Sequence, residues 1–424
     1  MNEYKISQDL NALFKEVYAD RLERLIPDNV RLQTDIKFSE ADSTGDVFVQ
    51  PVMLTEEQGF THSADKTNAF AINDAIPADY RDAHVDGVSL VLKSQISYQQ
   101  AAKAAKGGAK SFVNGTAQMM EALRKSVAKR LEILILYGES AKGLARVKTA
   151  VSSPSATSQV VEIVDGDWAD GIWAGARGVK LDVYSETNAD PATMANPVDD
   201  RQDQIEVVSV DLEAKTLTVK GLSADLAVND TLVYAGSLRT TFLGLDRIIA
   251  NNTDPIFNIS RATYELWRGN EAAVNGKLTV DAILTSVGKA VGRGLSGDVN
   301  LYVNHKTYES LNQSLHNDKR SIDSSYNMTK QNLANKKICV TYQAGVINVV
   351  PSIFVKESEA YLFPPKVCKR IGAQDVSFRT PGFDKDHIFH RMEQNLGFAV
   401  RCFTHQALFI EYPAHCVKLT GITL

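Results

Sequence analysis

The sequence predicts an α+β fold that contains a separate all-β segment. A strong helical periodicity occupies residues 97–138, and alternating β patterns dominate residues 160–240. From residue 246 onward, short helices and strands follow one another in mixed order. Because the two kinds of element do not alternate regularly, an α+β arrangement is favoured over a parallel α/β sheet. The 424 residues suffice for two or three domains.

The composition describes a globular chain without the charge of a dedicated nucleic-acid binder. Hydrophobic residues make up 44% of the chain, which supplies a sizeable core. The 46 basic residues stand against 51 acidic ones, whereas nucleic-acid binders usually have a strong basic excess. The N-terminal residues lack a signal-peptide pattern, and no apolar run approaches the roughly 20 residues that span a bilayer. We therefore expect a protein that is made in a cytoplasm and does not enter a membrane.

The first hundred residues predict a helix and then a long hairpin. In residues 1–26 apolar side chains recur at spacings of three and four, which predicts an amphipathic helix that needs a neighbour to cover it. Residues 46–56 and 84–96 are typical of two strands, and the polar residues 57–83 between them predict a projecting tip. Pro51 indicates that the first strand lies at an edge.

The strongest helical pattern lies in residues 97–138. Gly107 and Gly108 are expected to begin or kink this helix, and Gly138 is expected to cap its C-terminus. The apolar stripe consists of Phe112, Thr116, Met119, Leu123, Val127, Leu131 and Leu134.

The character of the chain changes near residue 150. Residues 151–159 are typical of a linker, and the alternation in residues 160–240 predicts a small inserted β domain. After the insertion we expect helices at 279–293 and 306–315. The strands expected there are 299–303, 338–342, 346–350, 353–355, 360–363, 396–403 and 406–412.

No motif predicts catalysis, a cofactor or a metal site. Residues 106–111 resemble a phosphate-binding loop but lack its glycines. His387 and His390 are three residues apart, as are Cys402 and His405, and on strands such pairs point to opposite faces. Known zinc spacings are lacking as well. We therefore expect a protein that is not an enzyme and that binds no cofactor or metal.

The four cysteines all lie in the last quarter of the chain. They are Cys339, Cys368, Cys402 and Cys416. Because no short Cys-x-x-Cys spacing occurs, we expect buried free thiols.

Several short segments of the chain, considered in their order along the sequence, resemble parts of a known protein family. Residues 52–61 (VMLTEEQGFT) and 85–90 (VDGVSL) resemble the outgoing and returning halves of an extended loop. Residues 134–138 (LILYG) resemble the end of a spine helix, and 242–245 (FLGL) resemble re-entry after an inserted domain. Over nearly the whole chain, this order resembles the major capsid proteins of tailed bacteriophages, of the Hong Kong 97 type.

The resemblance implies a division of the chain into six parts. In order, these are an N-terminal arm (1–45), an extended loop hairpin (46–96), a peripheral domain with the spine helix (97–150), an inserted β domain (151–245), returning peripheral elements with the axial domain (246–374), and C-terminal β elements of the peripheral domain (375–424).

The resemblance also implies a function, partners and a set of contact residues. The chain would assemble into hexamers and pentamers that form an icosahedral shell around double-stranded phage DNA, in virions made in the bacterial cytoplasm. The implied partners are further copies of the chain, a separate scaffolding protein, a portal, a decoration protein, and DNA held by weak non-specific contacts. The candidate subunit-interface residues are Leu10, Phe14, Leu54, Glu57, Phe60 and Lys66.

Two other functions remain open on the sequence. An encapsulin-like compartment shell has the same fold, although the insertion at 151–245 favours a phage protein because encapsulins are usually shorter. A ligand-binding protein that uses the inserted β domain is the second alternative, since a fold alone does not fix a function.

Overall fold

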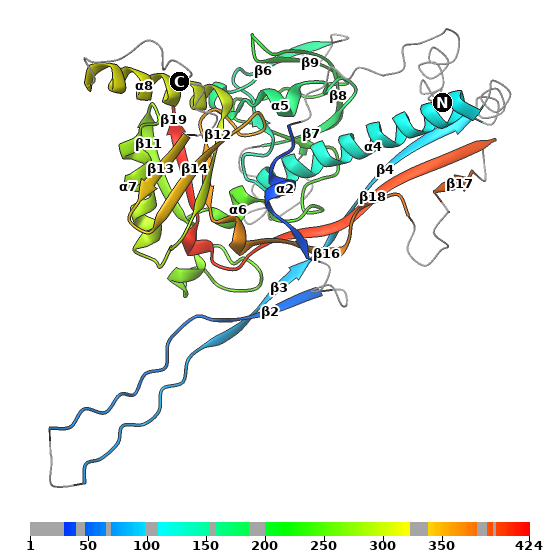
Figure 1. Ribbon diagram of the computed structural model, residues 1–424. Helices are drawn as coiled ribbons and strands as arrows, with labels where there is room; N and C mark the ends of the chain where they lie inside the picture. Colours follow the sequence, from blue (N-terminus) through cyan, green and yellow to red (C-terminus); the bar gives the residue numbers. More distant parts are fainter. Residues whose placement is uncertain are drawn as a thin grey trace.

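The computed structural model describes residues 29–39, 47–64, 69–97, 109–152, 158–185, 200–322, 338–379, 388–392 and 396–424. These residues form a mixed arrangement of helices and sheets, which confirms the predicted α+β class (Figure 1). The helix predicted for residues 1–26 lies outside the described residues.

The extended hairpin begins as a two-stranded sheet and projects away from the body (Figure 1). Strand β2 (Val47–Met53) pairs antiparallel with β3 (Tyr80–Asp86). The prediction of one return strand at 84–96 was wrong, because the chain breaks at Gly87 and continues as β4 (Val88–Ser97) in another sheet. A Cβ atom at Gly87 would lie 2.2 Å from the His405 ring, so any other residue there would require this side chain to move.

Helix α4 (Ala109–Tyr137) is about 43 Å long. The helical pattern was predicted from residue 97, but Ser97 ends β4, and residues 98–108 lie outside the described residues. The end of the helix differs from the prediction, because the residue with a left-handed backbone is Glu139, with φ 51°. Gly138 is needed for a different reason: a Cβ atom there would lie 2.2 Å from the Phe242 carbonyl oxygen. The described part of the predicted stripe is buried at Leu123, Val127, Leu131 and Leu134.

A five-stranded sheet runs alongside α4. Its order is β1-β16-β18-β17, and β4 also pairs with β18. The strands not yet given are β1 (Phe38–Ser39), β16 (Cys368–Ser377), β17 (Phe389–Arg391) and β18 (Gly397–Ile410).

Strand β18 corrects the prediction of two strands at 396–403 and 406–412, since it is continuous. Thr404 and Gln406, at the junction of the two predicted strands, are buried and hydrogen-bonded. Gln406 donates to the Thr404 hydroxyl over 2.8 Å and accepts from Arg370 over 3.0 Å. Side-chain partners therefore let polar residues stay inside the strand.

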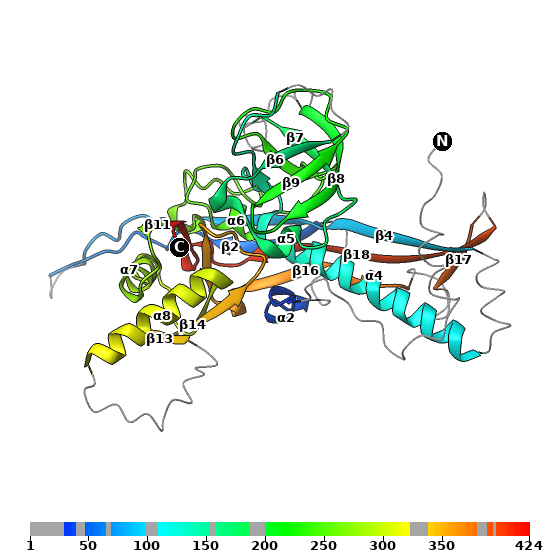
Figure 2. The ribbon, with the colours of Figure 1, turned by 90° about the horizontal axis from the view of Figure 1, so that it is seen from above.

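The inserted segment forms an antiparallel six-stranded sheet that stands out to one side of the body (Figure 2). Its order is β5-β10-β7-β8-β9-β6. The strands are β5 (Ala145–Arg146), β6 (Gln159–Glu162), β7 (Lys180–Tyr184), β8 (Asp200–Asp211), β9 (Thr216–Lys220) and β10 (Thr231–Tyr234). The sheet includes residues before 151, and the segment also contains η1 (Asp165–Asp167) and α5 (Asp170–Trp173).

The third large sheet has the order β11-β19-β15-β12-β14-β13. Its strands are β11 (Asn270–Gly276), β12 (Val299–Asn304), β13 (Ile338–Tyr342), β14 (Gly345–Ser352), β15 (Ala360–Phe363) and β19 (Val417–Ile422). Helices α7 (Val280–Val291) and α8 (His305–Ile322) pack on it and share its core. The remaining short helices are α2 (Leu32–Asp35), α6 (Leu245–Ile249), η2 (Glu265–Trp267), η4 (Pro365–Val367) and η5 (Pro413–His415).

Residues 353–355 do not form the predicted strand, although Phe354 and Val355 are buried. Their segment bonds to the insertion instead of to a neighbouring strand. The Gly171 amide donates to the Ile353 carbonyl over 2.9 Å, which ties α5 to this loop. The apolar run therefore predicted burial correctly but not the backbone partners.

The inserted sheet shares one continuous hydrophobic core with the rest of the body. Leu131 of α4, Leu232 of β10 and Phe409 of β18 belong to the same cluster. The insertion is thus packed into the molecule and not attached by a linker alone. Of the cysteines, Cys368, Cys402 and Cys416 are buried free thiols as expected, whereas Cys339 is exposed.

Candidate functional site: the projecting hairpin and a buried charged network

Beyond strands β2 and β3, the hairpin continues as two nearly parallel lines of extended chain (Figure 1). The Leu54 amide donates to the Asp79 carbonyl over 2.9 Å, and Gln58 forms an isolated bridge with Ile76. These sparse bonds keep residues 54–64 beside residues 69–79 without forming a regular sheet.

The middle of the hairpin depends on a glycine and an asparagine. Gly59 has φ +94°, and a Cβ atom there would lie 2.5 Å from the Asp74 carbonyl oxygen. Next to it, the Asn73 side chain donates to the Phe60 carbonyl, and the Asn73 amide donates to the Thr61 hydroxyl, both over 2.8 Å. The two lines of chain can therefore approach closely at this level.

Large apolar side chains are exposed along the whole hairpin. Such a concentration outside a core is typical of an interaction surface. Each of the following side chains is at least 38% exposed: Val47, Val49, Met53, Phe60, Phe70, Ile72, Ile76 and Tyr80. We call these eight residues the hairpin apolar set.

The six candidate subunit-interface residues predicted from the sequence fall into three groups. Phe60 is 71% exposed and Glu57 is exposed, so both are available to a partner. Leu54 is partly buried against the core of its own chain. Leu10, Phe14 and Lys66 lie outside the described residues.

Sequence reasoning missed the outer half of the hairpin apolar set. Ile72 is 80% exposed and Phe70 is 53% exposed, yet residues 57–83 had been interpreted as a polar tip. The signal was the even spacing of Phe70, Ile72 and Ile76, which places them on one side of an extended chain.

The hairpin base is fixed to the body by an aromatic cluster. The Phe48 ring of β2 lies 6.0 Å from Phe409 of β18, edge to face. Phe257 lies 5.3 Å from Phe409 and 6.5 Å from Trp267, and its carbonyl accepts the His84 amide over 3.0 Å. Aromatic pairs of this geometry each add about 0.5–1.5 kcal/mol beyond their buried area.

A polar contact fixes the hairpin just outside this cluster. The Tyr264 hydroxyl donates to the Asp79 carboxylate and accepts from Arg81 Nε over 3.3 Å. Arg81 also pairs with Asp79 over 3.2 Å. The hydrogen bond with Tyr264, together with the Asp79 charge, raises the pKa of Arg81. Tyr264 therefore holds the end of β3 to the loop before η2.

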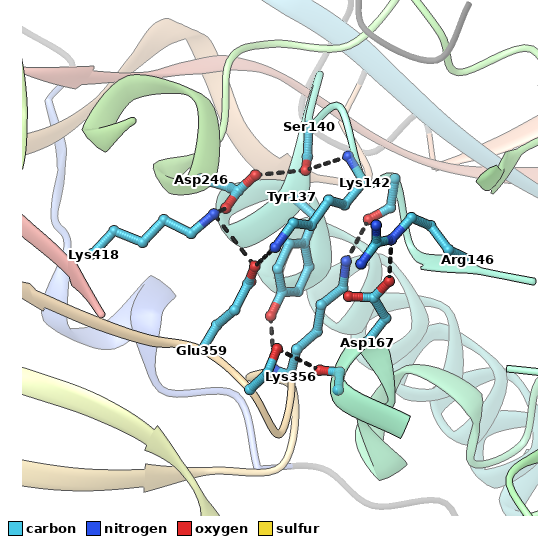
Figure 3. A network of polar contacts seen from close by, with 12 residues as sticks. Tyr137, Ser140, Lys142, Arg146, Asp167, Asp246, Lys356, Glu359 and Lys418 are labelled. Carbon is cyan, nitrogen blue, oxygen red and sulfur yellow. Dashed lines mark hydrogen bonds and ion pairs between the residues drawn. The ribbon is translucent and has the colours of Figure 1, made fainter. Parts of the chain in front are cut away.

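A buried network of charged groups joins the end of α4 to α6 and β19 (Figure 3). Lys418 of β19 forms an ion pair with Asp246 of α6, and its Nζ lies 3.3 Å from Glu359 Oε1. The Tyr361 hydroxyl lies 2.9 Å from Asp246 Oδ1 and 2.8 Å from Glu359 Oε2. Ser140 donates to the other Asp246 oxygen over 2.6 Å. Both carboxylates are therefore satisfied inside the protein.

The network extends from the end of α4 into the insertion. Lys142 pairs with Glu359 over 2.8 Å, and Lys356 Nζ donates to the Gly143 carbonyl over 2.9 Å while lying over the Tyr137 ring. A second pair joins Arg146 of β5 to Asp167 of η1 over 2.5 Å. The network thus connects α4, α6, β19 and the entry to the insertion.

The electrostatics of the network favour its charged form. Burial alone would raise the pKa of Glu359, but three surrounding lysines hold it well below its ordinary value. These are Lys418, Lys142 and Lys356. Burial would likewise raise the pKa of Asp246, and Lys418 more than offsets that effect. Because these groups are buried and paired with one another, the arrangement suits a structural joint between parts of the fold.

The described residues also bear on two other kinds of site. No group of three or more His, Cys, Asp or Glu side chains in them could hold a metal ion. Within the same residues, no helix is both long and apolar enough to cross a membrane.

Comparison with known proteins gives a structural match. No protein-family model matches the sequence, and neither does any curated protein. The chain is similar to one in the cyanophage A-1(L) capsid asymmetric unit, with a TM-score of 0.57 and 9% identity over 97% of this chain and 98% of that one. This match establishes that the chain has a phage capsid fold, as the sequence resemblance implied.

Two further solved structures have lower TM-scores. The capsid of an empty GTA particle gives 0.46, at 7% identity over 99% of both chains. The holo-SrpI encapsulin complex from Synechococcus elongatus PCC 7942 gives 0.44, at 7% identity over 100% of this chain and 96% of that one.

Proposed function

We propose that this chain is the major capsid protein of a tailed phage and that it assembles through its hairpin into a closed shell. In this proposal hexamers and pentamers of the chain form an icosahedral shell around double-stranded DNA, and the chain has a structural role without catalysis. The fold likeness supports the proposal, since the similar chain comes from a capsid.

The observation that carries the proposal is the exposure of the hairpin apolar set on the projecting hairpin. Eight apolar side chains at least 38% exposed leave a large apolar surface in water unless a partner covers them. The hairpin is fixed at its base and exposed along its length, which suits a contact with a neighbouring copy of the chain. Repeated around a ring, many such contacts made together bind far more tightly than any one alone.

The finer partners follow from the same proposal. We assign subunit contacts to Glu57, Phe60 and Lys66 on the hairpin, to Leu10 and Phe14 on the N-terminal arm, and to Leu54 just beyond β2. A scaffolding protein, a portal and a decoration protein would contact the shell, and DNA would be held by weak non-specific contacts. The net charge of −5 agrees with weak contact, because it provides no general attraction for phosphate.

Electron microscopy of the purified chain tests this proposal, with the chain expressed alone and beside a candidate scaffolding protein. Closed shells, or rings of five and six subunits, are the expected result. A monomer or dimer under both conditions would contradict the proposal and favour a ligand-binding role of the inserted sheet. Particles that contain an enzyme instead of DNA after production in the native host would favour the encapsulin-like alternative.

A further inference from the structure

Glu132 is a fully buried carboxylate near the C-terminal end of α4, within the apolar part of the helix. Its oxygens accept three backbone N–H groups from the start of α2. The Arg31 amide donates over 2.9 Å, the Leu32 amide over 2.8 Å and the Gln33 amide over 3.3 Å. Glu132 thereby holds the N-terminal end of this short helix, where donors have no partner inside the helix.

The same segment is held at its other end by Arg370 of β16. Arg370 Nε donates to the Ile36 carbonyl over 2.9 Å, and Nη2 donates to the Gln33 carbonyl over 3.3 Å. Strand β1 then pairs in parallel with β16, Phe38 opposite Arg370. Residues 31–39 therefore bridge two elements that are more than 200 residues apart in the sequence.

We propose that residues 31–39 form a pH-dependent clasp, in which a proton on Glu132 determines how tightly this segment docks against α4. The proposal rests on the geometry of the contact: one buried side chain supplies the acceptor for the whole N-terminal end of the segment. It does not depend on the proposed shell function.

The charged groups around Glu132 do not neutralise its negative charge. From α2, Asp35 adds a second negative charge, and its carboxylate is itself bound by the Tyr302 hydroxyl at 2.5 Å. The Arg31 residue is exposed, and Arg370 is engaged with the far end of α2.

The basic residues next to Glu132 on α4 are turned to other partners. Lys129 Nζ donates to the Ala174 carbonyl over 2.6 Å, and the Arg130 guanidinium lies 3.1 Å from the centre of the Tyr234 ring. Burial therefore outweighs the three amide bonds and raises the pKa of Glu132 to about 7.

The direction of the pH effect follows from linkage. When the segment undocks, Glu132 meets water and its pKa returns to its ordinary value of about 4.5. Because the docked form binds the proton more tightly, protonation favours docking. Docking should weaken as the pH rises from 4.5 to 7 and change little above that. Between pH 5.5 and 8 the docking equilibrium should fall about 25-fold.

Hydrogen–deuterium exchange of the full-length chain tests this inference, after correction for the intrinsic effect of pH on exchange. The protection of the amides in residues 31–36 should fall about 25-fold from pH 5.5 to pH 8. Glu132→Gln should remove this pH dependence, because glutamine keeps an acceptor but does not titrate. Glu121→Gln on the same helix, where Glu121 is 64% exposed, is the matched control and should keep it.

A second variant keeps the test decisive if Glu132→Gln does not fold. Asp35→Asn removes the neighbouring charge that raises the pKa of docked Glu132, so the loss of protection should be complete at a lower pH and smaller in total. Constant protection in the wild-type chain across this range would overturn the proposal. So would a wild-type pH response in Glu132→Gln, or an unchanged midpoint in Asp35→Asn.

Discussion

Lys418 Nζ lies 3.3 Å from Glu359 Oε1, and their side chains are only 7% and 1% exposed. Removal of one charge from a buried ion-pair network costs about 3–5 kcal/mol. Without Glu359, Lys418 keeps Asp246, but Lys142, Lys356 and Lys418 lose the carboxylate that they share. Glu359→Gln should therefore lower the free energy of unfolding by about 3–5 kcal/mol. Urea unfolding of the unassembled chain, followed by tryptophan fluorescence, measures this loss.

The control for this prediction is Glu265→Gln. Glu265 pairs with Arg293 over 2.7 Å, but its side chain is 70% exposed. Solvent-exposed pairs contribute about 0–1 kcal/mol, so this variant should unfold nearly as the wild type does. Losses of similar size in the two variants would contradict a special contribution of the buried network to stability.

The stability of the chain should pass through a maximum at mildly acidic pH. The carboxyls of Asp246 and Glu359 have pKa values below their ordinary range, so their stabilisation is present above pH 4 and is lost as the pH falls further. Glu132 and Glu139 act in the opposite direction, because burial raises the pKa of each. For Glu132, the stabilisation lost as the pH rises from 4.5 to 7 is about 3 kcal/mol.

Urea unfolding at a series of pH values between 3 and 8 checks this prediction. The wild-type chain should be most stable near pH 5, and Glu132→Gln should flatten the fall between pH 5 and pH 7. A wild-type free energy of unfolding that rises steadily from pH 5 to pH 8 would contradict the assignment of Glu132.

The sequence predicted those elements whose own periodicity determines their burial. The stripe through Leu123, Val127 and Leu131 predicted α4, and the alternation in residues 216–220 predicted β9. In both cases the relevant neighbours lie within one segment, so the pattern can be read without knowledge of the fold.

The parts that could not be predicted depend on partners far away in the sequence. Lys142 and Glu359 are 217 residues apart, and neither sits in a motif that announces the pair. The continuity of β18 through Thr404 depends on side chains of β16 in the same way. Exposed apolar residues such as Ile72 were missed for another reason, since the polar residues around them hide their even spacing.

Gly138→Ala should destabilise the chain although alanine favours helices. A Cβ atom at this position would lie 2.2 Å from the Phe242 carbonyl oxygen and 2.7 Å from that of Leu134, so the backbone must shift. Overpacking of this kind costs about 1–3 kcal/mol. The matched control is Gly288→Ala in α7, where a Cβ atom meets nothing within 4 Å. This substitution should stabilise the helix by about 1 kcal/mol. Thermal unfolding of the two variants should therefore shift in opposite directions, and a shift in the same direction would contradict the close contact at Gly138.

Ile72→Ser separates folding from assembly. Because Ile72 is 80% exposed in the single chain, its replacement should change the free energy of unfolding by less than about 0.5 kcal/mol. If a neighbouring copy covers this side chain, each contact loses about 2 kcal/mol of apolar burial, which raises the protein concentration needed for shell formation more than tenfold.

Val160→Ser, at a 57% exposed position on the inserted sheet, is the control and should assemble as the wild type does. Light scattering during assembly, with electron microscopy of the products, measures both variants. Normal assembly of Ile72→Ser together with failure of Val160→Ser would move the subunit contact from the hairpin to the insertion.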